Sequence, residues 1–265
     1  MKSLILTAVS LLALSLPASA GENRLQITQE GVDNELTVDQ SAATRSTVGG
    51  LVIDQTSETV YFQTGMRETD QVDEQGKPIF EPVYTGRPVG NLYASQADIA
   101  SQAGIGNSAT MTITGIDGWV GLLQETPSGS VDGNSATIEA LGGSSAYVGQ
   151  IGSNNTATLT ASDKASGTIL QSGHDNIGTV NVLGQGARAV LSQIGDGNNN
   201  QLDVTAPNAD VSYFVDGYGL SGLVPAEVST SVSGPITIRQ TAIGVSPLGA
   251  VTTLPSGVTV TQSGQ

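Results

Sequence analysis

A short string, Gln-x-Gly-x-x-Asn, recurs along this 265-residue chain at nearly constant spacing, and such a repeat restricts the fold more than any other feature of the sequence. The glycines of the five complete copies are Gly31, Gly104, Gly152, Gly173 and Gly195. A sixth copy is stretched, with nine residues between Gln124 and Asn134. From Gln102 to Gln193 the Gln-to-Gln spacings are 22, 26, 21 and 22 residues, and the interval of 26 contains the stretched copy. A period of 21 to 22 residues predicts that the chain stacks one structural unit on the next.

Alternation of side chains on both sides of the string predicts β-strands. One parity holds, for example, Ala146, Val148 and Gln150 before the glycine, and Asn155, Ala157 and Leu159 after it. The Gln-to-Asn interval of five residues is odd, so a straight strand would place the two amides on opposite faces. A tight turn at the glycine must therefore separate two strands. The predicted fold class is all-β: a β-solenoid of stacked strand-turn-strand repeats of about 22 residues, with two irregular insertions.

The parity that carries the aliphatic side chains also carries Gln and Asn, and it is nearly free of charge. A buried amide without hydrogen bonds is costly, but identical amides stacked at the strand spacing of about 4.8 Å can donate to one neighbour and accept from the other. We therefore expect an inward assembly ladder; the alternative is that these amides are ordinary turn and surface residues. The predicted ladder comprises Gln29, Asn34, Gln40, Gln102, Asn107, Gln124, Asn134, Gln150, Asn155, Gln171, Asn176, Gln193, Asn198 and Gln262.

Composition agrees with a thin, repetitive core and excludes several functions. Only 4% of the residues are aromatic and 34 are Gly, which favours two closely spaced sheets over an ordinary globular core. The formal net charge of −15, from 24 acidic and 9 basic residues, argues against nucleic acid as a partner. Because the chain contains no Cys, it can form neither a disulfide nor a thiolate metal site.

The repeats and the segments between them divide the chain into six parts. Residues 1–20 have the basic start, apolar run and Ala-Ser-Ala ending of a cleaved signal peptide, so we expect export. The remaining parts are N-terminal repeats at 21–66, a charged, Pro-containing exposed loop at 67–90, regular repeats at 91–205, an irregular insertion at 206–235 and degenerate repeats at 236–265.

The repeat resembles the curlin repeat, in which Ser precedes the Gln-x-Gly-x-x-Asn-x-Ala string and a further Gln follows it. Ser144, Gln150, Gly152, Asn155 and Ala157 match this pattern in order. The resemblance implies a secreted subunit that assembles with itself or a homologous curlin subunit into extracellular amyloid fibres for adhesion and biofilm matrix. It also implies export through an outer-membrane secretion pore with accessory proteins. The glycine-rich leader of curlins is not visible in this sequence.

Signals for catalysis or cofactor binding are weak, and we expect no enzyme, cofactor, metal or small-molecule substrate. His174 is the only His and lies in a turn, without a nucleophile elbow elsewhere. The glycine-rich turn at Gly195 lacks the alternating carboxylates of a calcium loop. An alternative function is that of a monomeric β-solenoid adhesin or ligand-binding protein, with the two insertions as its binding parts.

Three acidic residues lie inside the predicted Gln-to-Asn turns: Asp33, Asp175 and Asp196. One interpretation is that turn propensity alone accounts for them. A sharper hypothesis is that they are gatekeepers, whose negative charges repel one another and slow assembly until the chain is outside the cell.

Overall fold

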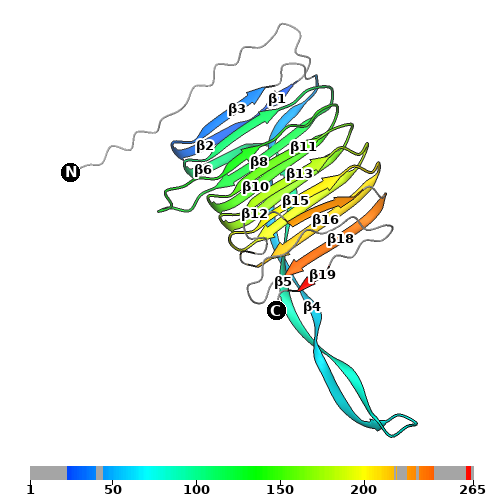
Figure 1. Ribbon diagram of the computed structural model, residues 1–265. Helices are drawn as coiled ribbons and strands as arrows, with labels where there is room; N and C mark the ends of the chain where they lie inside the picture. Colours follow the sequence, from blue (N-terminus) through cyan, green and yellow to red (C-terminus); the bar gives the residue numbers. More distant parts are fainter. Residues whose placement is uncertain are drawn as a thin grey trace, which may run out of the picture.

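The structure is a computed structural model that describes residues 23–39, 44–217, 219, 226–230, 233–241 and 261–263. Every helix or strand in these ranges is a β-strand, and the chain winds through them as a flat β-solenoid, which confirms the predicted fold class (Figure 1). Nothing in the described ranges is a helix that could span a membrane. The predicted signal peptide at 1–20 and the predicted ladder residue Gln40 lie outside these ranges.

Two parallel sheets face each other across the core, and each winding of the chain, here called a rung, contributes a strand to each. Sheet A contains β1 (Arg24–Leu25), β2 (Ile27–Val32), the start of β4 (Thr47–Val72), β6 (Ala100–Ile105), β8 (Trp119–Glu125), β10 (Ser145–Ser153), β12 (Ser166–His174), β14 (Arg188–Ile194), β16 (Ala209–Asp216), β18 (Gly234–Thr241) and β19 (Thr261–Ser263). Sheet B contains β3 (Glu35–Asp39), β7 (Ser108–Thr112), β9 (Ser135–Thr137), β11 (Thr156–Ala161), β13 (Ile177–Val182), β15 (Asn199–Val204) and β17 (Ala226–Thr230). We number the rungs 1 to 9 by their sheet A strands, with β1 and β2 in rung 1, β4 and β6 in rung 2, β8 in rung 3 and β19 in rung 9.

Neighbouring rungs pair in register, so that equivalent residues of the repeat lie directly above one another. Gln150 pairs with Gln124 on one side and with Gln171 on the other, and Ala157 pairs with Ala136 and Gly178. The core between the sheets is aliphatic, and Tyr213 contributes the one aromatic ring to it within the described residues. Likewise, no buried polar side chain in these ranges carries a charge, as the parity of the sequence predicts.

Rung 2 is interrupted by a long antiparallel hairpin formed by β4 and β5 (Pro78–Ala97). Gly49 pairs with Gly121 of rung 3, and the next position of the same rung is filled by Ala100, because Ser101 pairs with Leu123. Residues 50–99 are therefore inserted between two consecutive positions of one sheet A strand. A side chain cannot fit at the base of the insertion, where a Cβ on Gly50 would lie 1.8 Å from the carbonyl oxygen of Ile99.

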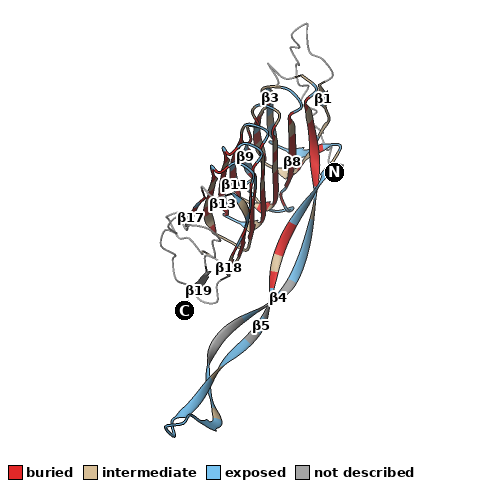
Figure 2. Ribbon diagram, turned by 90° about the vertical axis from the view of Figure 1, so that its right-hand side faces the viewer, coloured by how far each residue is buried: buried red, intermediate tan, exposed pale blue. Residues whose placement is uncertain are grey.

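The hairpin corrects the expectation of an exposed loop at 67–90. Residues 67–72 and 78–90 form the outer part of β4 and β5, joined by the turn at 73–77, in which Asp73 Oδ1 accepts the backbone N–H groups of Gln75 and Lys77. The inner part of the hairpin lies over the outer face of sheet A, and the outer part extends beyond β18 (Figures 1 and 2). Sequence inspection missed the hairpin because the pairing of β4 with β5 leaves no repeat and no change of period.

The predicted irregular insertion at 206–235 is also partly regular. Residues Ala209–Asp216 form β16, which pairs in register with β14 and β18 as rung 7. The motif is hidden because Val215 occupies the Gln position, with Val211 and Tyr213 keeping the inward alternation. β18 and β19, within the predicted degenerate repeats, continue the sheet with Gln240 opposite Gln262.

Candidate functional site

The turns between sheet A and sheet B place the repeated amides. At Gly152 the backbone has a φ of 121°, and a Cβ there would lie 1.9 Å from the carbonyl oxygen of Gly173 in the next rung. Glycine is thus required both by the backbone conformation and by the close approach of the neighbouring rung. The other predicted turn glycines share the positive φ: Gly31 (115°), Gly104 (104°), Gly173 (125°) and Gly195 (103°).

The Gln side chains of rungs 1 to 6 form a continuous ladder, as predicted, and from Gln102 to Gln193 it is buried. Gln150 is fully buried, and its Nε2 donates to Gln171 Oε1 at 2.8 Å and to the carbonyl oxygens of Ser135 (2.9 Å) and Asn155 (3.0 Å). The same Nε2-to-Oε1 bond joins Gln29 to Gln102 (2.6 Å), Gln102 to Gln124 (2.6 Å), Gln124 to Gln150 (2.8 Å) and Gln171 to Gln193 (2.8 Å). Because the carbonyls accept from Nε2, each amide has one orientation, and each Gln from Gln29 to Gln171 donates toward the higher-numbered rung.

The Asn side chains form a second ladder that runs in the opposite direction. Asn155 Nδ2 donates to Asn134 Oδ1 at 2.9 Å, toward the lower-numbered rung, and to the carbonyl oxygen of Gly173 at 2.8 Å. Corresponding bonds join Asn134 to Asn107 (3.2 Å), Asn176 to Asn155 (3.0 Å) and Asn198 to Asn176 (2.9 Å). From Asn34 to Asn176, each Asn Oδ1 also accepts a backbone N–H from the next rung, as Asn34 Oδ1 does from Asn107 at 3.0 Å.

These contacts resolve the problem of burying amides in an aliphatic core. A buried amide without partners costs several kcal/mol, whereas each interior amide here uses both its donor and its acceptor. The partners are identical residues of neighbouring rungs or backbone groups at fixed places in the turn. The site therefore extends by simple repetition and needs no other chemistry.

In rung 7 the Gln ladder is interrupted and two residues outside the predicted set bridge the gap. Gln193 Nε2 donates to Asn200 Oδ1 at 2.7 Å, and Asn200 Nδ2 donates to the hydroxyl of Tyr213 at 2.8 Å. The Tyr213 hydroxyl in turn donates to Gln240 Oε1. Burial raises the pKa of the Tyr213 phenol above its ordinary range, although the hydrogen bond from Asn200 opposes this shift. The sequence signal that could have revealed this bridge is Asn200, an amide on the inward parity at a position where other units carry Ala, Gly or Leu.

The ladder is one-sided at rung 1. Gln29 is exposed and donates to Gln102, while its Oε1 accepts no hydrogen bond from the described residues. β3 pairs with β7, and no second partner for β3 lies within the described ranges. At the other end, the backbone of Gln262 pairs with Gln240, which places it on the ladder axis. Buried Gln240 Nε2 finds no acceptor in the part of the chain that the structure describes.

The three acidic turn residues do not occupy one common position. Asp33 and Asp175 adopt the left-handed conformation (φ of 57° each), as Asn154 does in rung 4. Asp196 lies one position earlier in its turn and accepts the backbone N–H of His174 at 2.8 Å, while Asp175 accepts from Asn154 Nδ2 at 2.6 Å. Asp33 of rung 1 is far from the other two, because three rungs lie between rung 1 and rung 5.

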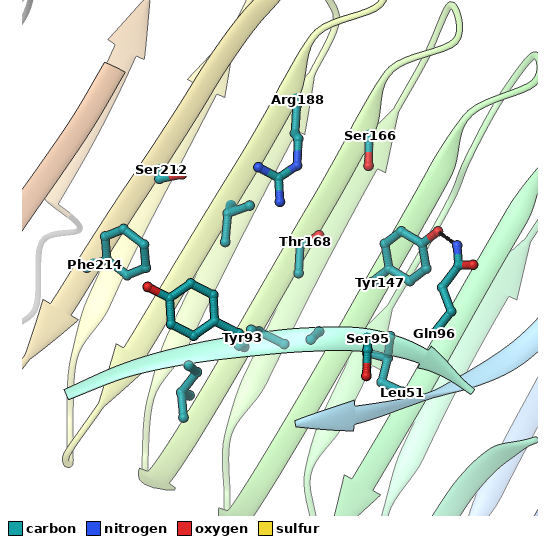
Figure 3. A pocket seen from close by; sticks show the side chains of 14 residues that line it. Leu51, Tyr93, Ser95, Gln96, Tyr147, Ser166, Thr168, Arg188, Ser212 and Phe214 are labelled. Atoms are coloured by element: carbon teal, nitrogen blue, oxygen red, sulfur yellow. Dashed lines mark hydrogen bonds between the residues drawn. The ribbon is translucent and has the colours of Figure 1, made fainter. Parts of the chain in front are cut away.

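A pocket of about 280 Å³ lies between the hairpin and the outer face of sheet A (Figure 3). Tyr93 and Gln96 of the hairpin form one wall, and Tyr147, Thr168 and Phe214 of sheet A form the floor and sides. Gln96 donates to the hydroxyl of Tyr147 and closes one end of the pocket. The lining combines aromatic rings and hydroxyl groups and suits a small amphipathic ligand.

Catalytic and metal-binding groups are sparse in the described ranges. His174 Nδ1 lies 2.7 Å from Ser153 Oγ in an exposed position, and no described carboxylate bonds to the His174 ring. No group of three potential metal-ligating side chains occurs among the described residues.

Comparison of the chain with known protein families, with curated proteins and with solved structures finds no match. The functional assignment therefore depends on the geometry of the rungs and on the resemblance carried by the Gln, Gly and Asn of each turn.

Proposed function

We propose that this chain is a structural subunit, resembling curlin, that assembles head to tail into extracellular amyloid fibres for cell adhesion and biofilm matrix. The observation that carries the proposal is the in-register stacking of identical amides from rung to rung. A second copy placed on the stack repeats the contact that each rung already makes with its neighbour. The same parallel pairing and amide ladders underlie cross-β fibres.

The direction of the ladder supports head-to-tail growth. Gln29 offers an acceptor on the outer side of rung 1, and the Gln amides of the higher rungs donate toward the opposite end of the stack. A copy added in the same orientation matches donor to acceptor, whereas a reversed copy would place acceptor against acceptor. In addition, parallel strands pair across the junction only if both copies keep one orientation.

The proposal includes export by the predicted signal peptide and, following the curlin resemblance, passage through an outer-membrane secretion pore. Its partner is the same chain or a homologous curlin subunit, with no catalytic step and no cofactor. The charged side chains whose burial the structure describes lie outside the core, and the net charge of −15 keeps the exported chain soluble before it assembles.

Purified protein incubated at neutral pH provides the first test. We expect dye-binding fibres with a cross-β reflection near about 4.7 Å. A protein that stays monomeric and soluble over several days would refute the proposal.

Gln29→Leu provides a sharper test, because it removes the amide that a neighbouring copy would meet. We expect seeded elongation to slow by about tenfold or more, since a donor at the junction would lose its acceptor. Gln26→Leu is the matched control: Gln26 lies between β1 and β2, next to Arg24, and has the opposite parity. Equal elongation rates for the two variants would contradict a role for the ladder at the junction.

The pocket beside Tyr93 favours a second candidate function, ligand binding by a monomeric surface adhesin. This alternative predicts that Tyr93→Ala abolishes binding of the protein to cells or matrix while leaving fibre formation unchanged. The fibre proposal predicts that adhesion falls together with the rate of assembly in Gln29→Leu.

A further inference from the structure

The hairpin gathers the aromatic residues of a chain that has few of them. Of three Phe and six Tyr, residues 51–97 contain two Phe and three Tyr. Aromatic side chains are enriched where proteins contact one another, because they combine large area with low flexibility. The composition of the hairpin is therefore that of an interface and contrasts with the rest of the molecule.

The inner part of the hairpin already uses its aromatic and aliphatic side chains to bind sheet A. Leu92 is 2% exposed, and its backbone N–H donates to Ser192 Oγ at 3.2 Å. Tyr93 packs against Phe214 with ring centroids 6.4 Å apart, and the guanidinium of Arg239 lies 5.2 Å from the Phe214 ring centroid. This contact defines how a segment of this kind sits on the outer face of sheet A.

The outer part of the hairpin carries similar side chains but extends past the last rungs, where its own solenoid cannot cover them (Figure 2). Tyr61 is 69% exposed, Phe80 51% and Tyr84 58%. Such exposed aromatic residues on a projecting element indicate a binding surface.

The path of the hairpin can be followed rung by rung. Gln96 contacts Tyr147 of rung 4, Leu92 contacts Ser192 of rung 6, and Gly90 donates to Asp216 of rung 7 at 2.6 Å. β5 therefore advances by two residues per rung. Two residues per rung brings Tyr84 level with the tenth rung, which is rung 1 of a copy that follows β19.

The path also shifts toward the Gln-to-Asn turns. In rung 4 the contacted residue, Tyr147, lies three positions before the Gln of the rung, whereas in rung 7 Asp216 lies one position after Val215, which occupies the Gln position. The shift is four positions over three rungs, so at the tenth rung the hairpin lies over the turn, about four to five positions after the place of the Gln.

Val32, which is 50% exposed, directly precedes that place in rung 1. It pairs with Ile105 of rung 2, so two apolar side chains adjoin on the turn edge. The equivalent positions in rungs 4, 5 and 6 are polar: Ser153, His174 and Asp196. Rungs 1 and 2, which the projecting hairpin of a preceding copy would reach, therefore have an apolar turn edge, unlike rungs 4 to 6.

We propose that the outer part of the hairpin of one copy binds the next copy of this chain in the fibre, with Tyr84 and Tyr61 against Val32 and Ile105. This inference rests on the proposed head-to-tail assembly. The hairpin then fastens two copies across a junction that the strands alone would hold only by their edges.

Cross-linking tests the contact directly, because the chain has no Cys and engineered thiols are the only ones present. Fibres of the double variant Tyr84→Cys/Val32→Cys, treated with a short bis-maleimide, should yield a ladder of covalent multimers on a denaturing gel. Tyr84→Cys/Ser153→Cys is the matched control, since Ser153 occupies the same turn position in rung 4, out of reach of Tyr84. The unassembled monomer of the first variant should give no cross-link.

Fibres that form without the Tyr84–Val32 cross-link, or that cross-link equally at Ser153, overturn the hairpin contact and leave the fibre function standing. Absence of fibres in the unmodified protein overturns the fibre function itself. A second measurement is independent of thiols: Tyr61→Ser/Tyr84→Ser should raise the concentration of unassembled protein at equilibrium by about tenfold or more, as expected when interface aromatics are truncated. An unchanged concentration also overturns the contact.

Discussion

Substitution of one interior ladder residue should weaken the stack locally by an amount that the hydrogen bonds define. In Gln150→Leu the buried volume is nearly kept, but Gln171 Oε1 loses its donor and the bonds to Ser135 and Asn155 disappear. Gln124 Nε2 loses one of three acceptors and keeps the carbonyls of Ser108 and Asn134. The main effect is therefore one orphaned buried acceptor, on Gln171.

An orphaned buried acceptor costs about 1–3 kcal/mol, and loss of the remaining bonds adds about 1 kcal/mol, so local opening should become easier by about 2–4 kcal/mol. That corresponds to amide hydrogen exchange about 30- to 1,000-fold faster in the strands next to the substitution. Hydrogen exchange with mass spectrometry on the monomer measures this rung by rung.

Gln201→Leu is the control, because Gln201 lies in a strand of the same kind but on the outer parity of sheet B, where it bonds to Asp203. We expect its effect to stay within about 0.5 kcal/mol, as for other surface substitutions. If Gln150→Leu exchanges no faster than Gln201→Leu, the ladder does not stabilise the rungs and the reasoning fails.

Three further predictions concern the turns and the interrupted rung. Gly152→Asn should destabilise the fold by about 2–5 kcal/mol in thermal unfolding, because a Cβ at this position would collide with Gly173. Gly76→Asn is the control, since Gly76 also has a positive φ but has open space around it, and it should not destabilise the fold. Similar losses of stability in the two variants would contradict the packing argument. The pKa of Tyr213 is raised in the folded protein, so the neutral phenol contributes fully to the free energy of unfolding below pH about 10. Above that pH the free energy of unfolding should fall by about 1.4 kcal/mol per pH unit. Denaturant unfolding between about pH 8 and 11 should show this slope in the unmodified protein and a shallower one in Tyr213→Phe; equal slopes would exclude Tyr213 as its source. Replacing Asp33, Asp175 and Asp196 together by Asn should shorten the polymerisation lag, because the variant loses like charges that repel one another. An unchanged lag would refute the gatekeeper hypothesis.

The regular part of the fold was predictable because its determinants are local and repeated. An odd Gln-to-Asn interval and a central glycine require a turn, and the same interval recurs from Gln102 to Asn198. The inward amides followed from parity alone, and the structure pairs them as expected in rungs 1 to 6.

The irregular part was not predictable, since it depends on contacts between distant residues. Asp98 lies four residues before Gln102, so simple alternation would place it inside. Rung 2 instead takes Val48 from before the hairpin and Ala100 from after it, and Asp98 is exposed. Rung 7 was hidden because Tyr213 and Asn200 replace the missing amide by a contact that no spacing rule encodes.

The opposite directions of the two amide ladders have an electrical consequence. Each Gln amide adds a dipole along the stack in one sense, and each Asn amide adds one in the reverse sense. Parallel sheets themselves contribute only small net dipoles, unlike an α-helix, whose aligned peptides accumulate partial charges at its ends. The axial dipole therefore does not grow as rungs are added. The electrostatic potential that an arriving copy meets at the end of a fibre of such subunits would therefore be the same whether the fibre contained ten subunits or ten thousand.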